Sequence, residues 1–190
     1  MTSPYESCPV FENENYLIRL IGAQDASDLL LVYSDEKALP FFNSDNCGGD
    51  DFHMTLLEHV QGAIKAWLEE YERKGFVRWS VIDKNAWHVV GTIELFNRHA
   101  DDYFNDCGIL RLDLRSDYES REAIVEILSL ITQPAFELFD CQMIATKIPL
   151  FASLRKLAAK ELGFASSSEK LIGHDGKAYG DYFVLLKNNT

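Results

Sequence analysis

Residues 107–148 constrain the fold most, because they read as a strand, a helix and a strand in succession. In the first strand, 107–115, leucines alternate strictly with polar residues, which is typical of a strand with two different faces. From Tyr118 onward apolar residues recur at helical spacing as far as Leu138, and Pro134 should kink or split this helix. Residues 141–148 form the second strand. A crossover helix between two strands favours parallel pairing, so we expect these strands to be parallel neighbours in one sheet.

The rest of the chain adds strands and helices on both sides of this unit. β-rich or alternating segments predict strands over 16–21, 76–83, 87–96, 164–171 and 179–187. Helical patterns cover 26–33, with Asp25 as N-cap, and 153–162, with Gly163 just beyond its end. Hairpin turns are expected at 84–86 and at 175–176. The alternation predicts one domain, 1–190, of the α/β class (α+β by some schemes), with a mixed sheet and helices on both faces.

A further helix, over residues 55–74, has the clearest local pattern. Thr55 and Glu58 have the spacing of a capping box, and Gly75 is placed to end the helix. Its apolar stripe predicts packing onto the core, with Trp67 buried, and consists of Leu56, Val60, Ala63, Ile64, Trp67, Leu68 and Tyr71.

Composition excludes several classes of function. The chain has 18 Lys and Arg against 30 Asp and Glu, a formal charge of −12, which opposes sequence-independent nucleic-acid binding. The acidity suits either a cationic substrate or simple solubility. No apolar run has membrane-span length and no secretory signal is visible, so a cytoplasmic protein without membrane association is expected. The four cysteines and five histidines show no metal-ligand spacing, so no metal is expected.

Several short motifs, taken in order, resemble one family. They are VGTIEL at 90–95, LDLRSDY at 112–118, Glu126, the Ala135-Phe136 pair, KELGF at 160–164, and Asp181. Their order and spacing over about 16–187 resemble the GNAT superfamily of acyl-CoA N-acetyltransferases, in particular the branch that acetylates ribosomal-protein N-termini.

This resemblance implies a specific cofactor site. In a GNAT fold the two parallel strands part like a V. Backbone groups of the strand at 107–115 would then bind the pantetheine of acetyl-CoA, the co-substrate. The pyrophosphate would rest on the N-terminus of the next helix. The resemblance therefore assigns cofactor binding to Leu112, Leu114, Ser120, Arg121, Glu122 and Ala123.

The phosphate turn departs from the superfamily motif, Gln/Arg-x-x-Gly-x-Gly/Ala, at three positions. Glu119, Glu122 and Ile124 stand where the motif has Gln or Arg, Gly, and Gly or Ala. The two carboxylates oppose an anion, whereas Arg121 attracts it and Ser120 can donate a hydrogen bond. The same two glutamates also suit the first turn of a helix that binds no anion.

Acetyl transfer to an amine needs a base, because an alkyl amine is protonated at neutral pH. Glu94 is the first candidate and Asp113 the second. Glu94 could instead be a solvent-facing strand residue, and Asp113 could pair with Arg111 or Arg115 on the same strand face. No general acid is assigned, although Tyr179 and Tyr182 are the nearest tyrosines in sequence order.

Two hypotheses about function follow. The first is an N-acetyltransferase that transfers an acetyl group from acetyl-CoA to a primary amine of a protein N-terminus, a polyamine or a small cationic metabolite. The loop with Asp45, Asp50 and Asp51 could steer a cation, or could simply be solvated. The alternative is a GNAT-fold binding or regulatory module with a degenerate CoA site and no catalysis. The sequence does not indicate an oligomeric state.

Overall fold

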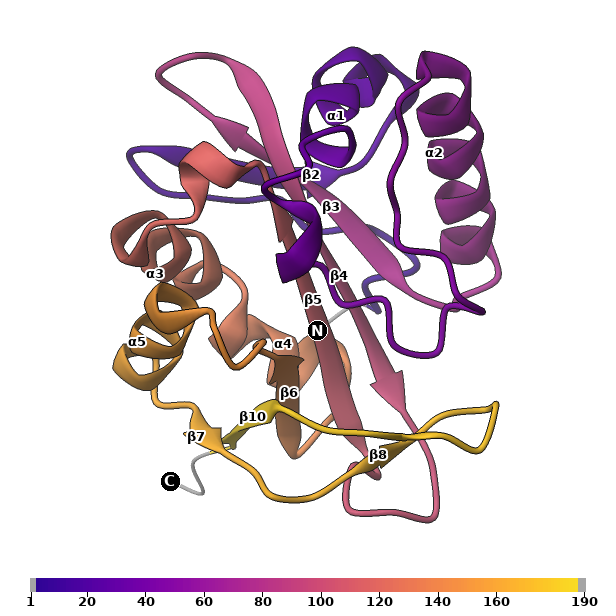
Figure 1. The fold of residues 1–190 in the computed structure, drawn as a ribbon, viewed down its shortest axis with the longest axis vertical. Coiled ribbons are helices and arrows are strands. Elements are labelled where there is room, and N and C mark those ends of the chain that lie inside the picture. The colour runs from indigo at the N-terminus through magenta and orange to yellow at the C-terminus, as the bar shows by residue number, and fades with distance from the viewer. Residues whose placement is uncertain (1–2, 188–190) are drawn as a thin grey trace.

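A mixed sheet runs through the centre of the molecule (Figure 1). The computed structural model describes residues 3–187. In sheet order the strands are β1 (Phe11–Glu12), β2 (Tyr16–Leu20), β3 (Val77–Asp83), β4 (His88–Arg98), β5 (Cys107–Leu114), β6 (Met143–Lys147), β10 (Tyr182–Leu186) and β7 (Ala165–Ser166). Within these residues β5 and β6 are the one parallel pair, and every other neighbouring pair is antiparallel. The predicted parallel pairing is therefore confirmed.

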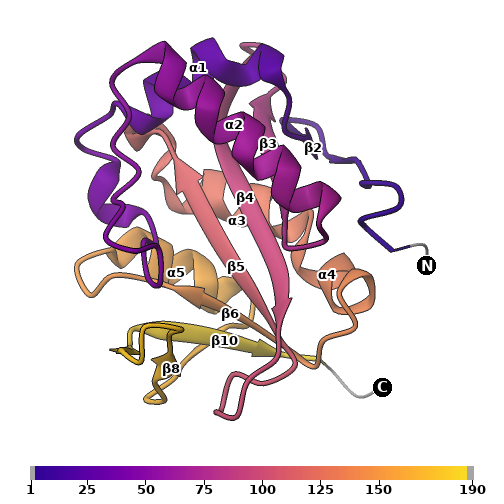
Figure 2. The same cartoon turned by 90° about the vertical axis from the view of Figure 1, so that its right-hand side faces the viewer.

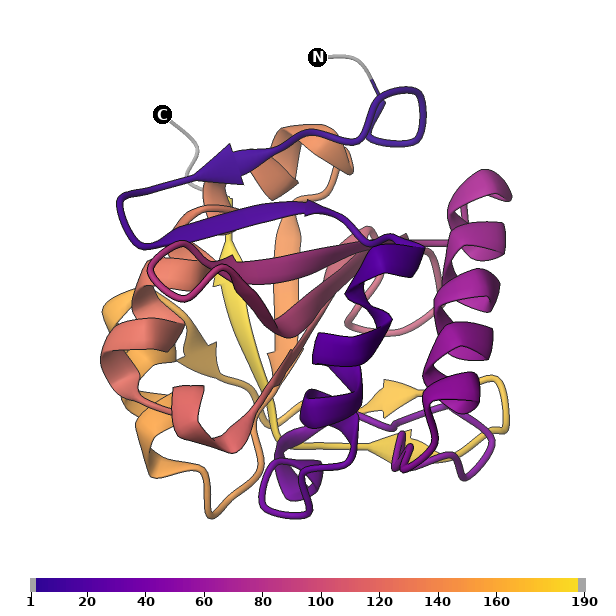
Figure 3. The same cartoon turned by 90° about the horizontal axis from the view of Figure 1, so that it is seen from above.

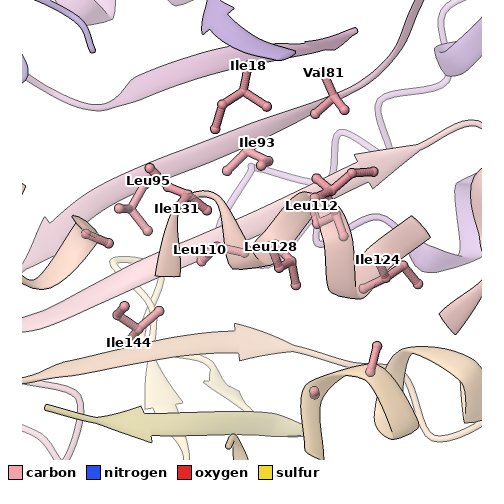
Figure 4. Packing of buried hydrophobic residues seen from close by; sticks show 14 of the residues in the cluster. Ile18, Val81, Ile93, Leu95, Leu110, Leu112, Ile124, Leu128, Ile131 and Ile144 are labelled. Carbon is pink, nitrogen blue, oxygen red and sulfur yellow. The ribbon is translucent and has the colours of Figure 1, made fainter. Parts of the chain in front are cut away.

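Helices cover both faces of this sheet, as predicted (Figures 1 and 3). One face carries α1 (Ala26–Tyr33) and α2 (Leu57–Glu72). The other carries α3 (Arg121–Ser129), α4 (Thr132–Leu138) and α5 (Ser153–Glu161). The larger core lies beneath the second group, where Leu110 and Leu112 of β5 pack near Ile124 and Leu128 of α3 (Figure 4). Within residues 3–187, three short 3-10 turns join these elements: η1 (Ala23–Asp25), η2 (Leu39–Phe41) and η3 (Ser116–Tyr118).

The apolar stripe of α2 packs as expected, but both helix ends differ from the sequence prediction. Trp67 is 8% exposed, which confirms its burial. The helix begins at Leu57 rather than at Thr55, and its N-cap, Leu56, makes no side-chain hydrogen bond. The predicted capping box is therefore wrong. At the other end Lys74, with φ of 62°, takes the left-handed position expected of Gly75.

The ends of the other helices follow their sequence signals in part. Pro134 does separate two helices, because α3 ends at Ser129 and the proline lies in the first turn of α4. N–H groups of a first turn have no acceptor within the helix, so the missing N–H of proline costs no hydrogen bond there. Gly163, with φ of 90°, follows α5 as predicted. Asp25 precedes α1 without capping it. Its carboxylate instead accepts hydrogen bonds from Arg19, from Ser80 and from the Gly22 N–H.

The C-terminal strands are shorter than predicted. Only Ala165–Ser166 of the expected strand 164–171 joins the main sheet. A separate hairpin pairs β8 (Leu171–Ile172) with β9 (Ala178–Tyr179) around the predicted turn, where Gly176 has φ of 76°. The chain then leaves β9 and enters β10 through Asp181, whose φ of 66° breaks the extended run predicted for 179–187.

None of the helices within residues 3–187 is long and apolar enough to cross a lipid bilayer.

Candidate functional site

The parallel strands β5 and β6 part along their length (Figure 2). They pair only from Cys107 and Met143 to Leu110 and Thr146. β6 pairs with β10 along its whole length and continues beside it past that point, since Lys147 pairs with Tyr182 and the Ile148 N–H donates to the Asp181 carbonyl at 2.9 Å. A gap therefore opens beside the last four residues of β5.

Polar backbone groups of β5 face this gap. The Arg115 N–H donates to the Val90 carbonyl at 2.9 Å, and the pairing of β4 with β5 has no register shift. Because backbone direction alternates along a strand, Leu112 and Leu114 turn their N–H and C=O groups away from β4 and toward the gap. These are the two β5 residues that the resemblance assigned to pantetheine.

A narrow apolar cleft, with a free volume of only about 10 Å³, continues from the gap onto the face of the sheet that carries α3 and α5. Its lining is Leu112, Ile124, Leu128, Thr146, Ile148, Arg155, Ala159 and Phe164. Ile124, one of the three departures from the superfamily motif, is 1% exposed and belongs to the core. Its side chain therefore contributes to the wall of the cleft and to packing.

The N-terminus of α3 lies at the mouth of this cleft. Ser120 caps the helix, because its Oγ accepts the Ala123 N–H at 3.2 Å. The N–H groups of Arg121 and Glu122 stand in the first turn, where no intrahelical acceptor exists. This turn can therefore donate hydrogen bonds to an anion, with help from the helix dipole.

The charges at the turn are paired in a way the sequence did not reveal. Glu119 forms a two-bond ion pair with Arg155 of α5, in which Nε lies 2.8 Å from Oε2, and both side chains are buried. The repulsion predicted for Glu119 is therefore offset by Arg155. Arg121 is 45% exposed and pairs with Glu161 at 2.7 Å and with Glu122 at 3.2 Å. Arg155 was missed because its partner lies 36 residues earlier in the chain.

On the opposite face of the sheet a buried cluster of charges lies beneath α1 and α2. Arg78 of β3 is 2% exposed and contacts both Glu94 of β4 and Asp113 of β5. Its Nη1 also donates to the Tyr33 hydroxyl at 3.0 Å. Arg111 donates to the second oxygen of Glu94 at 2.9 Å. The cluster thus holds two cations and two carboxylates.

This cluster contains both candidate bases, Glu94 and Asp113. Burial alone would raise the pKa of Glu94, but the charges of Arg78 and Arg111 outweigh it and hold that pKa below its usual range. Burial raises the pKa of Asp113, with Arg78 opposing the rise. Asp113 pairs with Arg78 and accepts the Tyr33 hydroxyl at 3.0 Å, and neither Arg111 nor Arg115 is its partner. Glu94 and Asp113 are 2% and 3% exposed, which does not suit a group that must reach a substrate proton.

A second polar group stands where β5 and β6 part. Asp45, from the loop that precedes α2, accepts Lys147 Nζ at 2.5 Å and the Tyr182 hydroxyl at 3.1 Å. Arg111 donates to the Asp45 backbone carbonyl at 3.0 Å and so joins this group to the buried cluster. Of the three aspartates singled out in this loop, Asp45 points inward, while Asp50 and Asp51 are exposed.

Among residues 3–187 no three His, Cys, Asp or Glu side chains gather closely enough to hold a metal ion.

Solved structures share this fold over nearly the whole chain. The ribosomal-protein-S5-alanine acetyltransferase from Vibrio fischeri aligns with a TM-score of 0.66 at 18% identity, over 95% of this chain and 98% of that one. RimL, a ribosomal L7/L12 α-N-protein acetyltransferase in complex with coenzyme A, gives 0.69 at 11% identity, over 94% and 98%. Mycobacterium smegmatis RimJ, in complex with a CoA-disulfide, gives 0.67 at 14% identity, over 89% and 79%.

The chain therefore has the GNAT acetyltransferase fold, and its similarity to ribosomal-protein acetyltransferases confirms the resemblance found in the sequence. No model of a known protein family matches the chain, and no curated protein sequence matches it. At these identities the similarity establishes the fold, while activity and substrate are separate questions.

Proposed function

We propose that this protein is an acetyl-CoA-dependent N-acetyltransferase that acts on a primary amine. The observation that carries the proposal is the gap between β5 and β6, which leaves the backbone groups of Leu112 and Leu114 without a pairing strand near the N-terminus of α3. Similarity to acetyltransferases of ribosomal proteins, two of them in complex with coenzyme A or its disulfide, supports the same function.

The cofactor would bind mainly through backbone groups. The pantetheine amides would pair with Leu112 and Leu114 as an added strand does, and the side chains that line the narrow apolar cleft would have to move apart around the methylene groups. The pyrophosphate would accept the first-turn N–H groups of Arg121 and Glu122, with Ser120 and Ala123 fixing the turn. Recognition by backbone N–H groups would explain how a turn that lacks the family's glycines can still bind the pyrophosphate.

The chemistry is direct attack of the amine on the thioester. The nitrogen forms a bond to the acetyl carbon, and the bond from that carbon to sulfur breaks. One proton of the ammonium group must first leave to a base, and a second passes from nitrogen to the thiolate. With the cofactor on the α3 and α5 side, the acceptor enters from the side of α1 and α2, where the loop with Asp45 supplies negative charge.

Within this function we assign Glu94 and Asp113 to positioning. Both carboxylates hold Arg78, and Glu94 also holds Arg111, which reaches the backbone of the loop at Asp45. Their burial leaves them without a direct path to an acceptor amine. The proton would therefore pass to a more exposed group or to water.

Calorimetric titration with acetyl-CoA, followed by an assay for released thiol, tests the proposal. The acceptors are a peptide with a free N-terminal alanine, the same peptide with a blocked N-terminus, and spermidine. We expect acetyl-CoA to bind and thiol to be released only with a free amine. Binding without thiol release for any amine would contradict the enzyme and favour the alternative below.

The alternative is a binding module without catalysis, and the Arg155–Glu119 ion pair favours it. This buried pair joins α5 to the turn before α3 across the mouth of the cleft, and Arg155 also donates to the Phe41 carbonyl at 3.2 Å. If the pair closes the cleft, wild-type protein should not bind acetyl-CoA. The double variant Arg155→Met with Glu119→Gln, which leaves no unpaired charge, should then gain binding.

A further inference from the structure

Lys147 occupies a special place in the sheet. It follows Thr146, the last residue of β6 that pairs with β5, and its own partner lies on β10. Its side chain is 23% exposed and lies on the face of α1 and α2. The ammonium group therefore stands beside the closed end of the gap, on the side from which an acceptor would enter.

The side chains around this ammonium group are arranged to bind a cation. Asp45, whose side chain is 9% exposed, lies 2.5 Å from Nζ and is itself oriented by the Tyr182 hydroxyl at 3.1 Å. The ring of Tyr179 lies 5.8 Å from Nζ, within the range of a cation–π contact. A carboxylate and an aromatic face are groups that bind an ammonium group and hold it in place.

The direction of the cofactor brings its thioester to the same place. With the phosphates on the N-terminus of α3, the pantetheine runs along β5 from Leu114 toward Leu110, a distance of roughly 13 Å for four strand residues. Beyond Leu110 the two strands close, so a thioester bound in this direction would end beside Thr146 and Lys147.

We propose, building on the function above, that Lys147 is an internal acceptor and that the protein acetylates its own side chain there. Asp45 takes one proton from the ammonium group, which leaves a neutral amine. Nζ then forms a bond to the acetyl carbon as the bond from that carbon to sulfur breaks. The remaining excess proton on nitrogen passes to the thiolate, and Asp45 returns its proton to water. The products are an amide at Lys147 and free coenzyme A.

Mass spectrometry of the full chain incubated with acetyl-CoA tests this proposal. Lys84 is the matched internal control, because its side chain is 26% exposed and its Nζ lies 2.7 Å from Glu12, yet it sits at the turn between β3 and β4. Proximity should raise acetylation of Lys147 at least about tenfold above that of Lys84. Chemical acetylation by solvent would instead modify both lysines to a similar extent.

Variants and a binding measurement separate this inference from the proposed function. Asp45→Asn should slow acetylation of Lys147 at least about tenfold, while acetyl-CoA affinity stays as in wild type. If acetyl-CoA binds and Lys147 is modified no more than Lys84, self-acetylation is refuted and the enzyme proposal stands. If calorimetry finds no binding of acetyl-CoA, both proposals fall.

Discussion

Replacing Glu94 by glutamine tests whether the buried charge cluster is a structural framework. The two arginines and two carboxylates of the cluster balance to zero formal charge in the native protein. Glu94→Gln keeps the shape of the side chain but leaves Arg78 and Arg111 facing Asp113 alone. The cluster then carries one uncompensated positive charge in a place where the Arg78 side chain is 2% exposed.

The expected loss of stability is large because the cluster is buried away from solvent. Breaking one partner of a buried ion pair costs about 3–5 kcal/mol. Glutamine retains one oxygen that can accept a hydrogen bond from an arginine, so we expect about 3 kcal/mol, the lower end of that range. Urea unfolding measures this loss as a lower midpoint at unchanged slope. The control is Glu70→Gln, whose pair with Arg73 is exposed and should contribute less than about 0.5 kcal/mol.

An activity profile separates this structural role from catalysis. A positioning residue predicts that Glu94→Gln lowers the free energy of unfolding and leaves the pH dependence of acetyl transfer in the same place. If Glu94 were the base, the variant would lose acetyl transfer at every pH, whatever its change in stability. A loss of unfolding free energy below about 1 kcal/mol would refute the framework argument.

Three more outcomes are expected. Trp67→Ala should lower the free energy of unfolding in urea by about 3–5 kcal/mol, because Trp67 is 8% exposed and its ring centroid lies 4.1 Å from the guanidinium carbon of Arg78. Trp87→Ala is the control: Trp87 is 69% exposed, so its replacement should change that free energy by less than about 0.5 kcal/mol. Arg121→Ala should weaken acetyl-CoA binding about tenfold in calorimetry, and an unchanged affinity would place the phosphates elsewhere. Acid should destabilise the fold as the pH falls from about 4.3, the pKa of glutamate in an unfolded chain, through the lowered pKa of Glu94 in the native protein. Urea midpoints that stay constant over this pH range would contradict the prediction.

The fold could be predicted where the deciding information is local. The helix Ala26–Tyr33 and the strands on both sides of the crossover follow directly from hydrophobic periodicity. The parallel pairing of β5 and β6 then follows from the crossover between them. The ends of α2 and the two-residue strands near the C-terminus could not be predicted, because single residues such as Lys74 and Asp181 decide them through backbone angles that their side chains do not favour.

The charge pairs of the candidate site could not be predicted, because their partners are distant in sequence. Asp113 was expected to pair within its own strand, yet its partner is Arg78, two strands away in the sheet and 35 residues earlier. Lys147 and Asp45 are separated by 102 residues. A periodic pattern shows which face a residue occupies, and it contains no information about which charge lies opposite.

The two faces of the sheet offer different chemistry, and this difference locates the proposed reaction. The face with α3 and α5 offers an apolar lining and the backbone donors of a helix N-terminus, which match in chemistry the apolar arm and the phosphates of acetyl-CoA. The opposite face carries the buried charges and Asp45, which suit an amine. An intact sheet separates the two faces, because its backbone groups are fully paired. Among the neighbouring strands of the described sheet, β5 and β6 separate beyond Leu110 and Thr146, so acetyl transfer should take place at that point of the sheet.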